Sequence, residues 1–430
     1  MGLTLSLALL AGSNILLTLL IQWYVITKLG VGIETDALFA GMALPQIILG
    51  IVSNALTHVL VPLLATEDES DFGRNAWGFF TGITGLFSVV ALLLYLTAGL
   101  WVPLLVPGFS AEARALTITL TRIQLVSMVF TASVSVLWSI YHARQRFIWA
   151  ELSPVISNIV ALLLLVKLLP LYGVAAAAWV IVLRTALQVG WLLPGLGRWQ
   201  RPEWKSPGMR EAGRRIRPLL LGMSYYRTDP LVDRFLTSMS PAGSLSLLYI
   251  GQQIYGVANV VIEKAIAAPM VPMLARMASA GDWTNFRSTY RKRLLAMLGL
   301  TLTGYAVLLL RGEWMLNLVI GRGGVTLGNV HLLWLILVAL VGFLVGGASG
   351  QVTATTFYAM GDTRTPTKLS IWTYSIYIPV KVIVFLHYGL LGLAMTTSVY
   401  ITVNLLMQIL LLERFSLPRR MRASLRDKLA

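Results

Sequence analysis

The sequence predicts an all-α polytopic membrane protein with about twelve transmembrane helices. Its mean hydropathy is +0.76, and only 12% of its residues are charged. The apolar residues are divided into separate segments, each bounded by turn residues or by charge. A membrane-spanning helix needs about 20 apolar residues, and the segments reach this length. The formal net charge of +16 lies mainly in the connections between them.

In chain order, the expected spans cover residues 4–28, 37–65, 77–106, 115–140, 151–170, 173–195, 217–238, 245–275, 293–310, 328–358, 367–386 and 390–412. Several are longer than an upright span requires, so we expect these helices to tilt or to continue along the membrane surface. Residues 1–26 have no basic start and no small-residue cleavage pattern, so we expect the first span to be retained.

Lysine and arginine gather in alternate connections, which predicts the orientation of the chain. The side rich in Lys and Arg holds Arg144 and Arg146, residues 198–217, residues 276–292, Arg364 and Lys368, and residues 414–428. Basic residues are translocated poorly, so this side is expected to face the cytoplasm together with both termini. The acidic residues 67–71 lie on the same side, but acids weigh little in this rule.

Short motifs recur at nearly constant spacing along the chain. Val61-Pro62-Leu63-Leu64-Ala65 is followed much later by Val271-Pro272-Met273-Leu274-Ala275, and Tyr172-Gly173 by Tyr388-Gly389. This repetition predicts two six-helix lobes related by a pseudo-two-fold axis along the membrane normal. The expected parts are an amino-terminal lobe at 1–200, a basic cytoplasmic linker at 201–216, a carboxyl-terminal lobe at 217–413 and a basic cytoplasmic tail at 414–430.

Three motifs, in this order, resemble a known family. They are Thr35-Asp36-Ala37-Leu38-Phe39-Ala40, then Val232-Asp233-Arg234-Phe235-Leu236 with Gly243-Ser244-Leu245-Ser246, then Tyr358-Ala359-Met360-Gly361-Asp362-Thr363-Arg364. The chain resembles the MurJ/MviN family of lipid II flippases, a branch of the multidrug/oligosaccharidyl-lipid/polysaccharide exporter superfamily. The resemblance implies a flippase of the bacterial inner membrane that moves an undecaprenyl-pyrophosphate-linked saccharide to the outer leaflet by alternating access.

The chain departs from the lipid II members of this family at several positions. Those members carry arginines in the first helix, after the Pro-Asn of the second and in the eighth. Here the first span has none before Lys28, Pro45 is followed by Gln46, and the eighth-helix position falls near Gln252. The cargo therefore stays open between lipid II and an exopolysaccharide or O-antigen unit.

The seventh span carries four charges around Pro230: Arg227, Asp229, Asp233 and Arg234. At about 100° per residue, the two arginines share one helix face and the two aspartates another. Guanidinium groups bind phosphates with several donors, so we expect Arg227 and Arg234 to face the cleft. The alternatives are pairing with carboxylates of neighbouring helices and, for Arg234, extension to the outer interface.

Two hypotheses account for the acidic face of Asp229 and Asp233. Some members of the family resemble sodium-coupled carriers with a seventh-helix aspartate as ligand, which implies a sodium site. Lys381 of the eleventh span lies at a similar depth to Asp233, and an unpaired lysine there costs about 3 kcal/mol. We favour an internal Asp233–Lys381 pair, with no resident cofactor and with sodium or proton coupling left open.

Other charges within spans are further candidates. Lys264 is a candidate diphosphate ligand, with Glu263 as its gate or as a proton-sensitive group; pairing across helices is the alternative. Arg122 and Arg184 are candidate substrate contacts in the amino-terminal lobe. Their alternatives are extension to the surface for Arg122, and pairing with Glu151 or a backbone carbonyl for Arg184.

Residues at the ends of spans complete the candidate set. Asp36 begins the second span at the outer mouth, where it can bind a sugar or, as we favour, cap a helix terminus. Arg144, Arg146, Arg364 and Lys368 are expected at a cytoplasmic gate or at anionic headgroups of membrane lipids, although topology alone also explains them.

Several functional classes are excluded or disfavoured. The sequence has no cysteine, which excludes disulfides and thiolate metal sites. Its four histidines lack metal-ligand spacing, and there is no glycine-rich nucleotide loop. We therefore expect a transporter instead of an enzyme, without nucleic acid and as a monomer. The rivals are a multidrug/cation antiporter of the same superfamily, which should have an acidic or apolar cavity, and a polysaccharide polymerase or ligase, which should have a large outer loop.

Overall fold

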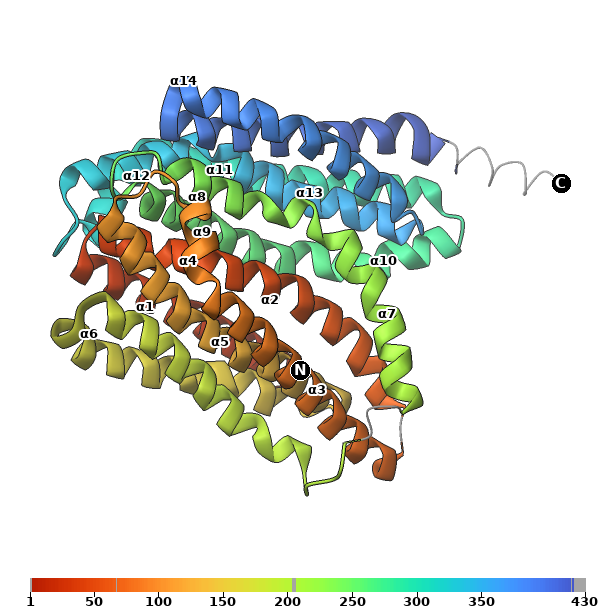
Figure 1. Ribbon diagram of the computed structural model, residues 1–430. Coiled ribbons are helices and arrows are strands. Elements are labelled where there is room, and N and C mark those ends of the chain that lie inside the picture. Colours follow the sequence, from red (N-terminus) through yellow and green to blue (C-terminus); the bar gives the residue numbers. More distant parts are fainter. Residues whose placement is uncertain (1, 67, 203–205, 419, 421–430) are drawn as a thin grey trace. The chain divides into compact units, whose positions relative to one another are not determined.

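The structure is a computed structural model, and it describes residues 2–66, 68–202, 206–418 and 420. These residues form helices and turns, with no strand among them (Figure 1). The predicted all-α class is confirmed. The chain divides into two compact units, Met1–Ser246 with Gly323–Val325, and Leu247–Arg322 with Thr326–Ala430. The lobe boundaries expected from the sequence repeat stay a prediction. Those boundaries come from similarity between the two halves of the sequence, whereas the two compact units are defined by contacts.

The first unit begins with long helices joined by short turns. They are α1 (Gly2–Leu29), α2 (Ile33–Ala65), α3 (Glu69–Leu96), α4 (Ala98–Leu105) and α5 (Ala111–Ala143). Side chains mark some of the starts, because the first N–H groups of a helix lack partners within it. The Ser110 hydroxyl, for example, accepts a hydrogen bond from the Ala113 N–H at the start of α5.

Helix α6 (Phe147–Leu192) contains two of the expected spans. Its helical conformation breaks at Gly173, whose φ of 58° and ψ of −146° favour glycine. Beyond the break the second arm packs against the first, since Arg184 donates a hydrogen bond to Asn158 across them. Figure 1 shows the two arms side by side. The short helix η1 (Leu193–Leu196) follows the second arm.

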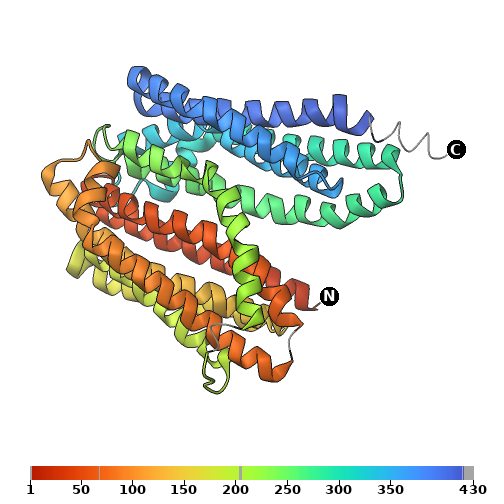
Figure 2. The same cartoon turned by 45° about the vertical axis from the view of Figure 1, so that its right-hand side comes forward.

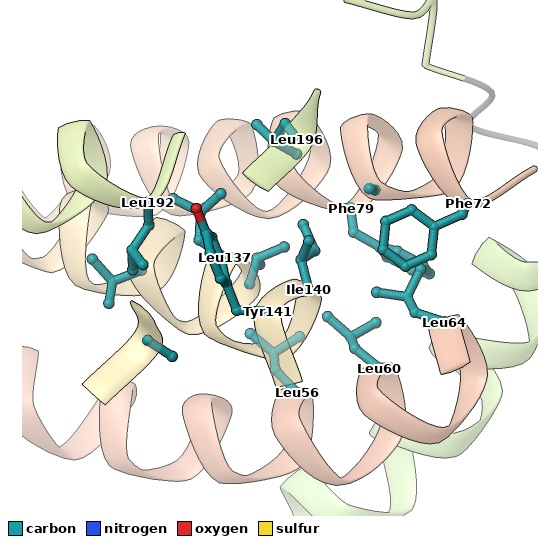
Figure 3. Close-up of a cluster of buried hydrophobic side chains, with 14 of the residues drawn as sticks. Leu56, Leu60, Leu64, Phe72, Phe79, Leu137, Ile140, Tyr141, Leu192 and Leu196 are labelled. Atoms are coloured by element: carbon teal, nitrogen blue, oxygen red, sulfur yellow. The ribbon is translucent and has the colours of Figure 1, made fainter. Parts of the chain in front are cut away.

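A buried apolar cluster holds α2, α3, α5 and η1 together at one end of the first unit (Figure 3). Tyr141 of α5 stands among leucines of α2, α6 and η1 in this cluster. A Cβ at Gly195 would lie 2.3 Å from Cε2 of Tyr141. The close approach of η1 to α5 thus requires a glycine at this position.

The seventh span is not one regular helix. It consists of α7 (Pro207–Ser224), the 3₁₀ turn η2 (Tyr226–Thr228) and α8 (Asp229–Thr237). Pro230 lies in the first turn of α8, where its missing N–H costs nothing. The 3₁₀ turn winds more tightly than an α-helix, so the angle between Arg227 and Arg234 differs from that of one regular helix, and the shared basic face stays a prediction.

The second unit is built from both short and long helices. They are α9 (Ser244–Ile262, whose first residues belong to the first unit), the π-helix η3 (Glu263–Ala267), α10 (Ala268–Ser279), α11 (Trp283–Ile320), α12 (Leu327–Ala339), α13 (Val341–Ala359), α14 (Arg364–Leu411) and the π-helix η4 (Leu412–Ser416). Figure 2 shows α10 and α11 lying side by side, joined by the turn at 280–282.

Helix α14 repeats the hairpin of α6. It breaks at Gly389, whose φ of 58° and ψ of −144° nearly equal those of Gly173. Tyr377 of the first arm shares a 2.9 Å hydrogen bond with Thr397 of the second, and its ring stacks on Tyr400 at 4.3 Å. The two glycines that the sequence repeat pairs therefore adopt the same conformation at equivalent reversals.

The number of spans is partly defined by the structure. Among the described residues, 8 helices are long and apolar enough to cross a membrane, and the bent pair α12–α13 raises the number to 9. Two of these helices, α6 and α14, each contain a hairpin. The protein is thus a multi-pass membrane protein, and a total of twelve spans stays a prediction.

The break between α12 and α13 has no proline, and the axis bends there by 41°. Side chains from α9, α11 and α14 donate to carbonyl oxygens around the break: Tyr255 to Leu337 (2.8 Å), Tyr305 to Val338 (3.1 Å), Ser398 to Ala339 (2.5 Å) and Asn259 to Phe343 (2.9 Å). In a membrane interior these oxygens have no water to bind. The neighbouring helices therefore stabilise a break that the local sequence does not encode.

Candidate functional site

Asp36 is buried and caps a helix other than its own. Its Oδ2 accepts a 2.6 Å hydrogen bond from the Gly243 N–H, and its Oδ1 accepts bonds from the Ser246 N–H and hydroxyl at 2.7 and 2.5 Å. These donors lie at the start of α9, whereas the residue before α2 is Gly32. Capping of its own helix is thus corrected to capping of α9. With 3% of its surface exposed, Asp36 is not an open sugar ligand.

The turn before α9 packs closely on the turn before α2. Gly243 has a φ of 91°, and a Cβ there would lie 2.5 Å from Cγ1 of Val31. A second close contact lies nearby in sequence, because a Cβ at Gly30 would lie 2.7 Å from the carbonyl oxygen of Gly324. Glycines let these backbones approach closely. The hydrogen bonds of Asp36 therefore join two turns that are distant in sequence but packed together.

Arg227 of the seventh span is half-buried, and its guanidinium contacts the backbone of another helix. It lies in η2, and its Nη1 donates a 3.2 Å hydrogen bond to the carbonyl oxygen of Gly50 in α2. A guanidinium has five N–H donors. The bond to Gly50 anchors the side chain through one of these donors.

Two of the other three charges of this span are buried. Asp229 is half-buried, as Arg227 is, whereas Asp233 and Arg234 are 1% and 3% exposed; all three have polar interactions of their own. The expectation that Arg234 faces an open cleft or reaches the outer interface is therefore wrong. A buried guanidinium in a membrane helix is stable only within protein contacts.

Lys381 is fully buried in the second unit. Its Nζ lies 4.9 Å from the centroid of the Tyr377 ring, a cation–π distance. Asp233 belongs to the first unit, so its pairing with Lys381 stays a prediction. Among the described residues, no cluster of three or more acidic or histidine side chains could hold a metal ion.

Sequence reasoning missed a polar network within the second unit. The Thr353 hydroxyl donates to Gln408 at 2.6 Å, Gln408 donates to Asn404 at 2.6 Å, and Asn404 donates to Thr373 at 2.8 Å. Asn404 and Gln408 are four residues apart in an apolar span, and this spacing is the signal that could have found them.

Arg184 joins a similar network in the first unit. It donates to Asn158 at 3.2 Å, and Asn158 donates to Asn14 of α1 at 2.7 Å. The sequence predicted Glu151 or a backbone carbonyl as the partner of Arg184, and it did not indicate Asn158. Arg122 lies over the Tyr95 ring at 5.1 Å and donates to its carbonyl oxygen at 3.4 Å. This position at the end of α3 supports the alternative that Arg122 extends to the surface.

The remaining candidates lie near helix ends or in the π-helix. Arg144 and Arg146 in the first unit are exposed, as are Arg364 and Lys368 in the second. Arg144 covers the ring of Phe72 at 4.1 Å. In η3, Glu263 is half-buried, while the side chain of Lys264 lies outside the described part.

The turn before α14 has a well-defined carboxylate. Asp362 accepts hydrogen bonds from the N–H and the hydroxyl of Thr365 at 3.0 and 2.6 Å. Burial raises the pKa of Asp362, but these hydrogen bonds and the charge of Arg420 outweigh it, so the pKa lies below its ordinary value. The aspartate therefore stays ionised at neutral pH and caps the helix that follows.

Comparison with known proteins identifies the family. The family described as lipid II flippase MurJ matches residues 25–425. The chain belongs to the MurJ family. The resemblance predicted from the three motifs is thereby confirmed.

Curated relatives agree with this assignment. A probable lipid II flippase MurJ of Bdellovibrio bacteriovorus is 23% identical over 414 residues, which cover 92% of this chain and 79% of the relative. A probable lipid II flippase MurJ of Vibrio cholerae is 25% identical over 404 residues, covering 88% and 76%. Membership of the MurJ family, together with the apolar helices, indicates a multi-pass transporter of the bacterial inner membrane.

Solved structures share the fold. A lipid II flippase MurJ in an inward closed conformation superposes with a TM-score of 0.83 at 20% identity, covering 97% of this chain and 90% of that chain. An inward-facing multidrug resistance MATE family transporter gives a TM-score of 0.76 at 18% identity, covering 95% of both. The MurJ fold therefore extends over nearly the whole chain.

Proposed function

We propose that this protein flips an undecaprenyl-pyrophosphate-linked saccharide from the cytoplasmic to the outer leaflet by alternating access. Membership of the MurJ family supports a lipid-linked saccharide as cargo. The lipid is lipid II or an exopolysaccharide or O-antigen unit. The protein acts as a monomer with both termini in the cytoplasm, and Arg144, Arg146, Arg364 and Lys368 line its cytoplasmic gate.

The observation that carries the proposal is the anchored guanidinium of Arg227. A diphosphate needs several charge-assisted hydrogen bonds, which a guanidinium supplies in a fixed geometry. The bond to Gly50 orients the side chain from α2. Lys264 and Arg184 supply further positive charge along the pathway, with Glu263 beside Lys264.

A cation antiporter of the same superfamily is the second candidate. The shared fold of MATE transporters favours it, but its cavity should carry acidic or apolar side chains. The seventh span here presents a partly exposed arginine; its Asp233 is buried, and its half-buried Asp229 has an interaction of its own. An anionic cargo therefore fits the described charges better than a cationic one.

Purified protein in vesicles should translocate a fluorescent undecaprenyl-diphosphate-linked saccharide. Growth of cells depleted of their own lipid II flippase then separates the cargoes. Restored growth identifies lipid II, whereas no growth at normal expression rules out lipid II and leaves an exopolysaccharide or O-antigen unit. Vesicles in which neither class of lipid moves would contradict the proposed function.

Arg227→Ala should reduce this translocation about tenfold or more, because a hydrogen bond to a charged group contributes about 1.5–3 kcal/mol. Arg227→Gln retains an N–H donor for Gly50 but not the charge, so it should flip as poorly as the alanine variant while unfolding at the wild-type temperature. Arg311→Ala removes an exposed arginine of α11 and is the matched control. An Arg227→Ala variant that flips normally would reject the anion site.

We also propose that Asp233 and Lys381 form an internal pair that takes the place of a bound sodium ion. Sodium should then leave the unfolding temperature of the wild type unchanged. Lys381→Gln should destabilise the protein, because removing one partner of a buried ion pair costs about 3–5 kcal/mol. Adding Asp233→Asn should restore part of the loss. Stabilisation of the wild type by sodium that Asp233→Asn abolishes would refute the pair.

A further inference from the structure

The two arms of α6 enclose an apolar groove of about 470 Å³. Ile156 and Val160 line it from the first arm, and Leu183, Leu187 and Gly190 from the second. The volume falls within the range of ligand pockets, about 300–1,000 Å³. It is therefore large enough for an elongated apolar molecule.

The groove lies in a membrane-spanning segment and opens on the surface of the hairpin. Phe147–Leu196 has a mean hydropathy of 2.3 in its most apolar stretch. Leu183 and Leu187 are 46% and 40% exposed. An exposed apolar wall within a membrane-spanning segment is suited to hydrocarbon, which favours a hydrocarbon chain as the occupant of the groove.

Aromatic and basic residues define one end of the groove. Trp191 lines it, and its ring lies 5.3 Å from that of Trp149 on the opposite arm. Tryptophans gather at the headgroup level of a bilayer. Just beyond, Arg146 precedes the first arm and Arg198 follows η1; both are exposed, while the acid that follows on the first arm, Glu151, is half-buried. The headgroup at this end is therefore anionic.

The length of the groove distinguishes between two kinds of lipid. From Leu183 to Trp191 the helix rises about 12 Å, against about 15 Å for the hydrocarbon of one leaflet. One acyl chain of a phospholipid spans a single leaflet, whereas an undecaprenyl chain is much longer. The dimensions thus favour the phospholipid.

We propose that this groove binds one acyl chain of an anionic phospholipid, with its phosphate at Arg146 and Arg198. The site lies within the first unit and does not depend on the identity of the transported saccharide. Gly190 leaves it open, because a Cβ built there meets no atom within 4 Å. A larger side chain at this position would fill the groove without displacing the helix backbone.

Native mass spectrometry of the detergent-solubilised protein with phosphatidylglycerol tests the site. Gly190→Leu should lower the retained phosphatidylglycerol at least tenfold. Gly304→Leu is the matched control, because Gly304 of α11 is also exposed and open; it should retain lipid as the wild type does. Equal retention by the two variants would overturn the proposal, and Gly190→Ala with an intermediate loss would support it.

Two further measurements identify the lipid. The double variant Arg146→Ala/Arg198→Ala should lose the preference for phosphatidylglycerol over phosphatidylcholine while still binding both. Undecaprenyl phosphate should compete no better than phosphatidylglycerol at equal concentration. Stronger competition, abolished by Gly190→Leu, would assign the groove to a polyprenyl chain and refute the phospholipid.

Discussion

Asp36→Ala is expected to lower the free energy of unfolding by about 3 kcal/mol or more and to reduce transport severely. The substitution leaves the buried N–H groups of Gly243 and Ser246 without their acceptor. Each unsatisfied buried group costs about 1–3 kcal/mol. The carboxylate also carries negative charge to the amino end of α9, where it is favourable. Losing it should release the turn before α9 from the turn before α2.

Chemical denaturation in detergent and translocation in vesicles measure the two effects. Asp36→Asn keeps one acceptor oxygen but not the charge, so its loss should be smaller than that of the alanine variant. Glu34→Ala removes an exposed carboxylate from the same helical turn and should leave both properties unchanged. An Asp36→Ala protein as stable as the Glu34→Ala protein would contradict the capping role.

Gly342→Ala is expected to destabilise the second unit by about 1–3 kcal/mol or more, the usual cost of overpacking. The added Cβ would lie 2.2 Å from the carbonyl oxygen of Ser398 and 2.6 Å from its Cα. Both are backbone atoms, so α13 and the second arm of α14 must move apart. That movement also weakens the bonds from the Gly342 N–H to the Ser398 hydroxyl and from this hydroxyl to Ala339.

Gly350→Ala is the matched control for this prediction. Gly350 lies in the same helix, and a Cβ there meets no atom within 4 Å. Alanine is favoured over glycine in a helix by about 1 kcal/mol, so this variant should be as stable as the wild type or more stable. The unfolding temperature should therefore fall in the order Gly350→Ala, wild type, Gly342→Ala. The reverse order would show that α13 and the second arm of α14 are not held in contact at Gly342.

Features that depend on local composition were predicted well. The hydropathy pattern predicted helices throughout, and the repeated Tyr-Gly pairs mark the two reversals at Gly173 and Gly389. The motif containing Asp36 led to the MurJ family before any contact was known. Each of these signals resides in a short stretch of chain, because apolar length, glycine and motif order can be read without partners.

Features that depend on partners were predicted poorly. Arg234 was expected to face the cleft and is buried, since helical periodicity cannot account for neighbouring helices. The break at Leu340 has no local signal, because the donors that stabilise it come from other helices. Asn158 and Arg184 were likewise recognised as partners only once the arms of α6 were seen together.

Local sequence is enough to show that this protein is a helical membrane carrier of the MurJ type, because transfer into hydrocarbon acts on each segment separately, and its Lys and Arg pattern predicts which side is cytoplasmic. Which charges are exposed and which are buried becomes visible only once the helices are packed together. Arg227 is anchored and partly exposed, while Asp36 caps α9 and Arg234 is buried. The environment of a charge in a membrane is set by the helices packed around it, and these come from distant parts of the chain.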